Sequence, residues 1–272
     1  MQPSKQQRVM SQSPVFPRIL INLLDDDKEQ CLDYAVSHGH GLEIRDIDWS
    51  SVMDDSAARA RLIQHYRSII ARIPGPVTTH SPDRDLSPGH TDPRVAAETR
   101  KCIAAFLDFA EEIGLPRVIS HTWSDDEALE QRGLAGWVER HSAFWRDVLA
   151  GRSIEVYLEN SWGHSPELLA AEVDGIDLPN VGACLDVGHA HLQGGSPLDQ
   201  WVDVLGPRIR HMHLHDNDGG SDQHLATGDG TIDWHQLIAA LRRNGLTPAA
   251  TLEVEGVSKS AASIEHLRRL GA

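Results

Sequence analysis

The stretch IEVYLENSWGHSPELLAAEVDGIDLPNVGACLDVG, residues 154–188, contains the pattern that decides the fold. Two short apolar runs, 154–160 and 181–188, have the composition of buried strands, and the segment 166–173 between them has that of a helix. Two parallel strands need a crossover of a dozen or more residues between them, and such crossovers are usually helical. The stretch therefore predicts one strand–helix–strand unit of an α/β protein.

The same alternation continues along the rest of the chain. Further strand-like runs lie at 18–24, 41–45, 76–80, 117–121, 208–214 and 249–255. Helical patterns lie at 28–39, 56–73, 92–114, 126–149, 233–245 and 260–271, with a weaker one at 196–206. These alternations predict a single-domain (β/α)8 barrel. An open doubly wound sheet is the alternative, but the first strand is not followed by a Gly-rich phosphate-binding fingerprint.

Helix boundaries carry recognisable signals. Asp92 and Pro93 predict the start of the third helix, and Gly114 predicts its end. Residues 1–17 are polar and interrupted by prolines, so they predict a flexible N-terminal tail ahead of a barrel domain that spans 18–272.

The amino-acid composition indicates which binding partners and which cellular compartment to expect. The 272 residues carry 25 Lys+Arg and 40 Asp+Glu, a formal net charge of -15. This acidic balance disfavours nucleic acid as a partner, although a bound metal cluster can reverse the field at a site. Cys31, Cys102 and Cys184 lie far apart, which is typical of thiols in the reducing cytoplasm. No apolar run reaches the length of about 18 residues that is needed to cross a membrane. The sequence is compatible with a homo-oligomer.

Side chains that bind metals recur where strands end. Active sites of (β/α)8 barrels lie at the C-terminal ends of the strands. The ligand-type residues at these ends and in the loop after the seventh strand are His80, His121, Glu159, Asp186, His189, His213, Asp222, His224 and Glu253. A lone histidine there is typically a hydrogen-bonded core residue, but unpaired carboxylates next to apolar strand positions cost several kcal/mol. The set therefore predicts a metal site in the barrel mouth.

Neighbouring residues receive secondary roles. His211, His213 and His215 share one face of the seventh strand, and we expect His213 to bind metal while His211 packs deeper. Glu43 on the second strand either reaches the barrel mouth or pairs with Arg45. The side chains expected to contact substrate are His189, His215, Arg84 and Trp123.

Several strand-end motifs resemble those of the xylose-isomerase-like barrel superfamily from about residue 18 to the end. They are THSP with His80, SHTW with His121, LENSWG with Glu159, LDVGHAH with Asp186 and His189, HMHLHD with His213, SDQH with Asp222 and His224, GDGTIDW, and LEVEG with Glu253. This superfamily contains sugar-phosphate isomerases and epimerases together with endonuclease IV.

The resemblance implies two different metal sites. The epimerase branch implies one divalent ion on Glu159, Asp186, His213 and Glu253. The endonuclease IV branch implies three zinc ions, for which the added ligands are His80, His121, His189, Asp222 and His224. The first strand, RILINLLDDD, departs from the His- and Gly-rich start of the nuclease branch, and GDGTIDW is closer to the isomerase version.

The leading hypothesis is a divalent-metal-dependent isomerase or epimerase of a small polyhydroxy carbonyl compound, with one to three Zn, Mn, Co or Mg ions. Glu159 or Glu253 would remove a proton beside the chelated carbonyl, and the other glutamate would return it. The second hypothesis is a multinuclear zinc phosphodiesterase of the abasic-site endonuclease type, in which Glu159 bridges two metals. The third is a non-catalytic metal or sugar binder, since a fold alone does not fix an activity.

Overall fold

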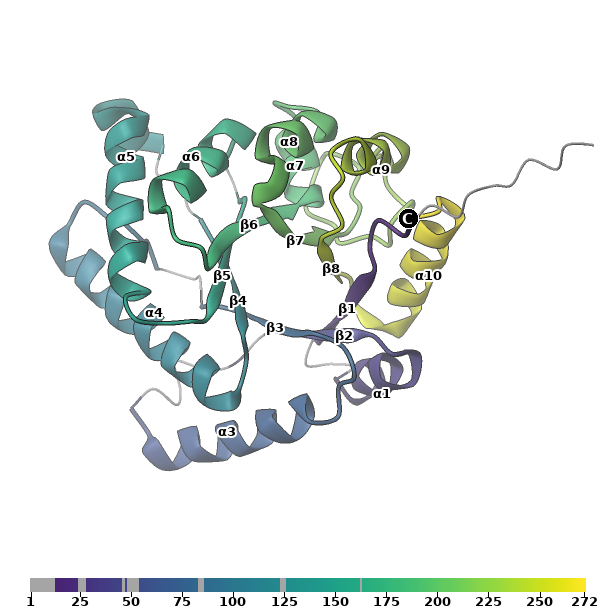
Figure 1. Cartoon of the computed structure of the whole chain (residues 1–272), viewed down its shortest axis with the longest axis horizontal. Coiled ribbons are helices and arrows are strands. Elements are labelled where there is room, and N and C mark those ends of the chain that lie inside the picture. Colours follow the sequence, from purple (N-terminus) through teal and green to yellow (C-terminus); the bar gives the residue numbers. More distant parts are fainter. Residues whose placement is uncertain are drawn as a thin grey trace, which may run out of the picture.

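The central feature of the molecule is a closed barrel in which each parallel strand pairs with its sequence neighbours and the last pairs with the first (Figure 1). Its strands are β1 (Arg18–Leu23), β2 (Gly41–Ile44), β3 (Val77–His80), β4 (Arg117–His121), β5 (Glu155–Glu159), β6 (Val181–Asp186), β7 (Ile209–Leu214) and β8 (Ala249–Leu252). The computed structural model describes residues 13–23, 28–45, 47, 54–82, 86–122, 126–161 and 163–272. The predicted (β/α)8 barrel is confirmed, and the open sheet is excluded.

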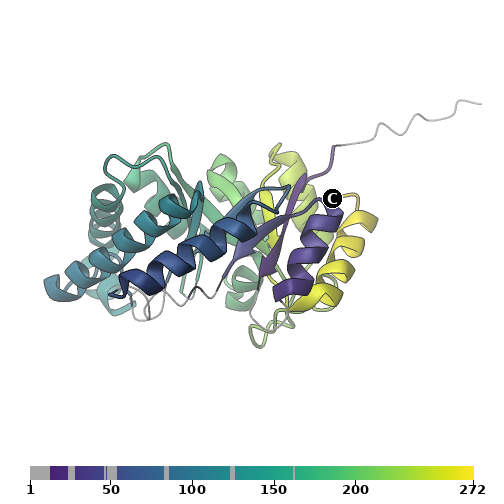
Figure 2. The ribbon, with the colours of Figure 1, turned by 90° about the horizontal axis from the view of Figure 1, so that it is seen from below.

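Helices surround the barrel on its outside (Figures 1 and 2). They are α1 (Lys28–His38), α3 (Ser56–Ile70), α4 (Pro93–Ile113), α5 (Asp126–Val148), α6 (Pro166–Ile176), α7 (Val187–Gln193), α8 (Leu198–Leu205), α9 (Trp234–Arg243) and α10 (Gly256–Arg269), with a 3-10 turn, η2 (Gly206–Arg208), ahead of β7. α1 and α10 lie side by side where β1 meets β8, so the ends of the described chain close the ring.

The predicted caps form at α4. The side chain of Asp92 accepts a hydrogen bond from the Arg94 amide, and Pro93 occupies the first turn. Gly114 ends the helix with a φ of 90°, in the left-handed region that favours glycine. One element was not predicted: α7 begins directly after Asp186, so the predicted strand 181–188 ends two residues early.

Alternate residues of each strand face two different environments. Leu42 and Ile44 of β2 lie in the main apolar cluster between barrel and helices, whereas Glu43 between them points to the barrel interior. The interior side of β4, β5 and β6 contributes only a small separate cluster, Ile119, Tyr157 and Cys184. Barrel interiors are usually filled by branched apolar side chains. Here much of that space holds buried polar groups, which support the site above them.

The packed chain begins ahead of β1. Val15 and Phe16, in the predicted tail, are buried in the main apolar cluster. The first twelve residues of the predicted tail lie outside the described residues. Within the described ranges, no helix combines the length and the apolar character needed to cross a bilayer.

Candidate metal centre

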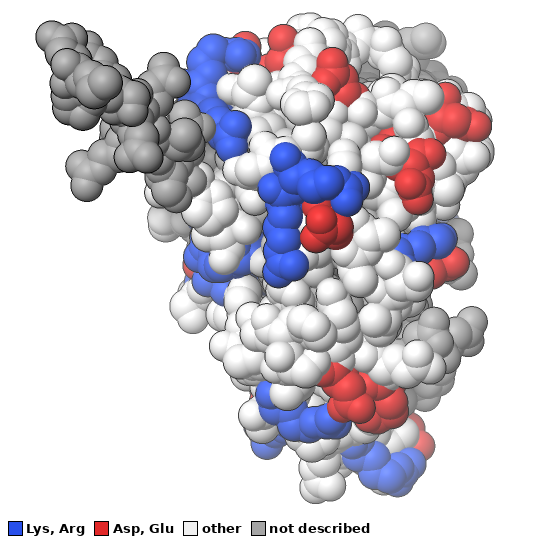
Figure 3. Space-filling view, turned by 90° about the vertical axis from the view of Figure 1, so that its right-hand side faces the viewer, with Lys and Arg blue, Asp and Glu red and all other residues white. Residues whose placement is uncertain are grey.

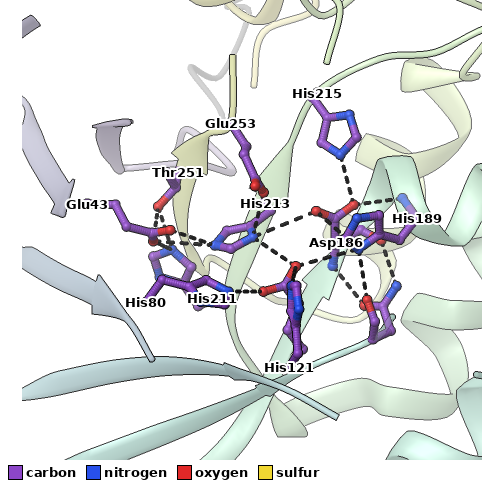
Figure 4. A network of polar contacts seen from close by, with 12 residues as sticks. Glu43, His80, His121, Asp186, His189, His211, His213, His215, Thr251 and Glu253 are labelled. Atoms are coloured by element: carbon purple, nitrogen blue, oxygen red, sulfur yellow. Dashed lines mark hydrogen bonds and ion pairs between the residues drawn. The ribbon is translucent and has the colours of Figure 1, made fainter. Parts of the chain in front are cut away.

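The centre of the site is the imidazole of His213 near the end of β7 (Figure 4). Its Nδ1 atom lies 2.8 Å from Glu253 Oε2, 3.2 Å from Glu159 Oε1 and 3.7 Å from Asp186 Oδ2. Ligand atoms of a tetrahedral zinc ion lie about 3.3 Å apart, given zinc–ligand distances of about 2.0–2.1 Å. Carboxylates from β5, β6 and the residue after β8 therefore each lie at about the distance from His213 Nδ1 that two ligands of one ion have from each other.

Glu159 extends this group towards β3 and β4. Its Oε2 atom lies 3.1 Å from His80 Nε2, and its Oε1 atom lies 3.3 Å from His121 Nε2. The same Oε1 atom lies 3.5 Å from His189 Nδ1. The two oxygens of this fully buried carboxylate thus face imidazoles from β3, β4 and α7. This placement is that of a carboxylate shared between two ligand groups.

A third group of ligand-type side chains lies where α7 meets the loop after β7. Asp222 Oδ2 is 3.4 Å from His189 Nε2 and 3.1 Å from His224 Nε2. The backbone of His224 has a φ of 46°, a left-handed conformation that is uncommon for a residue with a side chain. The His224 ring stacks on that of His215, with ring centroids 4.2 Å apart.

Backbone carbonyls fix which nitrogen of several histidines faces the site. His80 Nδ1 donates to the Ser81 carbonyl at 2.9 Å, and His189 Nδ1 donates to the Asn160 carbonyl at 3.0 Å. His224 Nδ1 donates to the Glu253 carbonyl at 2.7 Å. Because a carbonyl only accepts, these contacts place the proton on Nδ1 and leave Nε2 as the ligand atom. Such contacts orient metal-binding histidines in metalloproteins, so the residues present fit divalent ions.

The charges of the site also fit cations. Burial alone would raise the pKa of the Glu159 carboxyl, but His213 and His121 lower that pKa well below its ordinary value. Burial likewise opposes ionisation of Asp186, and His189 and His215 lower its pKa well below the ordinary value. Within the described part of the chain, Arg45 is the one Lys or Arg in ion-pair contact with a carboxylate of this site, namely Glu253. Glu159 and Asp186 are thus held as anions although both are fully buried.

The structure brings together the ligand-type residues that the sequence singled out. Two of the predicted substrate contacts, Arg84 and Trp123, lie outside the described residues. His215 is fully buried, and its Nε2 atom lies 3.1 Å from Asp186 Oδ1. Glu43 does not pair with Arg45 in the described structure; it contacts His213 Nε2 at 3.1 Å instead. The alternation of β2, with apolar residues on either side of Glu43, was the one signal for this.

Gly188 in α7 leaves the space that His215 occupies. A Cβ atom at this position would lie 1.9 Å from His215 Cε1, which is too close without displacement of the ring. We expect Gly188→Ala to destabilise the protein by about 1–3 kcal/mol, in the range of overpacked core substitutions, and to lower metal retention. Urea unfolding and metal analysis check this. A variant with wild-type stability and wild-type metal content would contradict the packing described.

A second buried histidine–carboxylate group lies outside the metal centre, between α5 and α6. Glu172 is fully buried, with Oε1 3.0 Å from His141 Nδ1 and Oε2 3.6 Å from His164 Nε2. The Thr122 hydroxyl lies 2.6 Å from His164 Nε2. Burial raises the pKa of Glu172, but contacts with His141 and His164 more than offset this, so its pKa lies below the ordinary value.

Glu172→Gln is expected to lower the free energy of unfolding by about 3 kcal/mol at neutral pH, because it removes one partner of a buried ionic group. A carboxyl whose pKa is lowered by folding stabilises the protein above its unfolded pKa of about 4.3, and this contribution is lost as the pH falls further. The difference between variant and wild type should therefore shrink below about pH 4. Urea titrations from pH 3.5 to 7.5 measure it, and a gap independent of pH would contradict this account.

Comparison with known proteins places this geometry in a family. The family model described as xylose isomerase-like TIM barrel matches residues 33–270. An uncharacterized protein of Methanocaldococcus jannaschii is 29% identical over 210 residues, which are 71% of this chain and 69% of that protein. A probable endonuclease 4 of Mycobacterium leprae is 28% identical over 195 residues, 66% of this chain and 74% of that protein.

Solved structures share the fold over most of its length. A D-tagatose 3-epimerase-like protein superposes with a TM-score of 0.75 at 22% identity, covering 93% of this chain and 96% of the other. A Thermus thermophilus protein soaked with zinc chloride superposes with a TM-score of 0.69 at 26% identity, covering the same shares. With the closed barrel and the family match over most of its length, the chain belongs to the xylose isomerase-like TIM barrel family.

Proposed function

We propose that the protein is a metal-dependent phosphoesterase whose substrate is a phosphate ester of a small polyhydroxy compound. The observation that carries the proposal is the position of Glu159, whose two oxygens face His80 on one side and His121, His189 and His213 on the other. A site for a single ion needs no such shared carboxylate. A shared carboxylate is a common bridge in sites with two or more ions, and such sites are typical of enzymes that hydrolyse phosphate esters.

Bound divalent ions would supply Lewis acidity that neutralises the charge on the attacking and leaving oxygens of a phosphate group. The residues of the chain would hold these ions in three groups: His80, His121 and Glu159; Glu159, Asp186, His213 and Glu253; and His189, Asp222 and His224. The least buried ligand side chains are Asp222 and His224, at 23% and 29% exposure. A substrate would therefore approach from the side of the loop after β7.

The surface supports a small substrate over a nucleic acid. On the face that carries α1 and α10, the described basic side chains are interspersed with acidic ones (Figure 3). The whole chain has a net charge of -15, so the protein offers little overall attraction for a polyanion. Similarity to a probable endonuclease 4 supports the phosphoester chemistry of the proposal rather than the size of its substrate.

The second candidate is an isomerase or epimerase of a small polyhydroxy carbonyl compound. It is favoured by the completeness of the group around His213 Nδ1, which would hold one ion by itself. In that reaction Glu159 and Glu253 would exchange the proton, with His189 and His215 near the substrate. Against it stands the burial of Glu159, which is 0% exposed and surrounded by imidazoles, so a substrate C–H bond has little access to it.

Metal content and activity together test the proposal. The experiment measures zinc, manganese, cobalt and magnesium in untagged protein by mass spectrometry, then assays hydrolysis of a phosphodiester probe and a panel of sugar phosphates. Two or three ions per chain with phosphate release support the phosphoesterase. One ion per chain, with solvent deuterium incorporated into keto-sugars, would replace it by the isomerase. Tight, salt-dependent binding and cleavage of abasic duplex DNA would show that the substrate is DNA rather than a small phosphate ester. Bound metal without any of these activities would indicate a non-catalytic metal or sugar binder.

A further inference from the structure

Glu43 lies inside the barrel, on the side of His213 opposite Asp186, and is fully buried (Figure 4). Its Oε2 atom accepts hydrogen bonds from the hydroxyls of Thr78 on β3 at 2.9 Å and Thr251 on β8 at 2.8 Å. Its Oε1 atom lies 3.1 Å from His213 Nε2 on β7. One carboxylate thus joins four strands of the barrel, and none of its partners is a Lys or Arg in the described structure.

The hydrogen bonds around Glu43 run in one direction. The Thr251 hydroxyl has a single proton, and it donates this proton to Glu43. The contact of 2.8 Å between Thr251 Oγ1 and His211 Nε2 must therefore carry the proton of His211. Both ring nitrogens of His213 face carboxylates, so with an ion bound at Nδ1 the one remaining ring proton lies on Nε2 and is donated to Glu43. The lone pair of His213 Nδ1 then points at Glu159, Asp186 and Glu253.

We propose that Glu43 is a positioning residue for the metal centre: it fixes the tautomer and orientation of His213, so that Nδ1 is the ligand atom. This role rests on the metal centre of the proposed function, although it does not depend on which reaction that centre performs. His213 differs from His80, His189 and His224, whose protonated nitrogens donate to backbone carbonyls. His213 instead donates to a charged group, which makes its imidazole a stronger ligand.

A purely structural role for Glu43 explains less. Burying a carboxylate costs several kcal/mol unless it is paired, and an apolar side chain would fill the barrel interior as in other barrels. The threonine hydroxyls do not require a carboxylate, because they could pair with backbone or with each other. The imidazole of His213 does require an acceptor at Nε2 whenever Nδ1 binds an ion.

The test compares Glu43→Gln with Glu172→Gln, a glutamate equally buried and also in contact with two histidines but outside the metal centre. Zinc affinity is measured by competition with a chromophoric chelator, and ligand geometry by the visible absorption spectrum of the cobalt-loaded protein. Both variants are studied at a temperature where circular dichroism shows them folded. No substrate is used, so the outcome is independent of whether the phosphoesterase proposal succeeds.

Glu43→Gln is expected to weaken zinc binding by about 10- to 100-fold and to shift the cobalt spectrum, because a glutamine amide can donate to Nε2 and move the proton to Nδ1. Glu172→Gln should leave both readouts unchanged. A second variant, Thr251→Val, keeps the carboxylate and removes one of its donors, and we expect a smaller loss of affinity. Unchanged zinc affinity and spectrum in Glu43→Gln, or an equal loss in Glu172→Gln, would overturn the assignment.

Discussion

Glu159→Gln is expected to lower phosphoester hydrolysis by about a thousand-fold and to reduce the number of bound ions. The Oε2 atom of this carboxylate faces His80 and its Oε1 atom faces both His121 and His213, so its charge contributes to two ligand groups at once. A bound metal contributes several kcal/mol of transition-state stabilisation, and about 4 kcal/mol corresponds to a factor of about a thousand. Initial rates at saturating metal, together with metal analysis of the same samples, measure both effects.

Glu155→Gln is a matched control for this experiment. Glu155 begins the same strand, β5, at the opposite end of the barrel from the metal centre, and its carboxylate contacts Tyr157 and Arg117. Its replacement should leave the rate and the metal content unchanged. If Glu159→Gln retained every ion and instead abolished solvent deuterium uptake into a keto-sugar, the glutamate would be a proton-transfer residue and the isomerase would be the correct function.

Removal of metal is expected to lower the melting temperature by about 10 °C as well as abolish activity. An ion present at about a thousand times its Kd stabilises the folded state by about 4 kcal/mol, and each kcal/mol shifts the melting temperature of a chain of this size by about 2–4 °C. The stabilisation is large because the ions would neutralise buried carboxylates such as Glu159 and Asp186. Calorimetry before and after dialysis against a chelator measures the shift.

Re-addition of zinc and the Glu159→Gln variant serve as controls for metal removal. Zinc should restore the melting temperature of the wild type. Glu159→Gln, with fewer bound ions, should respond less to the chelator. A wild-type melting temperature that does not change on chelation, with metal loss verified by mass spectrometry, would show that the carboxylate cluster is stable without cations.

Most of the fold was readable from the sequence, because the strand-like runs and the helical patterns are both strong. β5 and β6 are buried on both sides, as strands of a parallel barrel covered by helices are, and α4 carries its own start and stop signals. α7 was missed because VGHAHLQ is a single short helix of 7 residues without an apolar stripe. Its start depends on Asp186, whose place in the sequence indicates a metal ligand and gives no sign of a helix cap.

The candidate set of ligands was also readable, because parallel strands bring their C-terminal ends to one mouth, and the structure does bring those side chains together. The choice of reaction was not, since spacing along the chain does not show which side of Glu159 faces which histidine. The sequence therefore favoured proton transfer by Glu159, whereas its contacts favour a shared ligand. The role of Glu43 was equally hidden, because its partners Thr78, His213 and Thr251 lie on three other strands.

Asp186 shows how narrowly one position can be constrained. Its Oδ1 atom accepts the His189 amide at 2.7 Å and so caps α7, while its Oδ2 atom faces His213 Nδ1 in the ligand group. Asn and Ser also cap helices well but carry no charge, and Glu carries the charge on a side chain too long for the cap. Aspartate is the one amino acid that both caps α7 and places a charge against His213. We therefore expect every other residue at position 186 to weaken the start of α7 or the binding of metal.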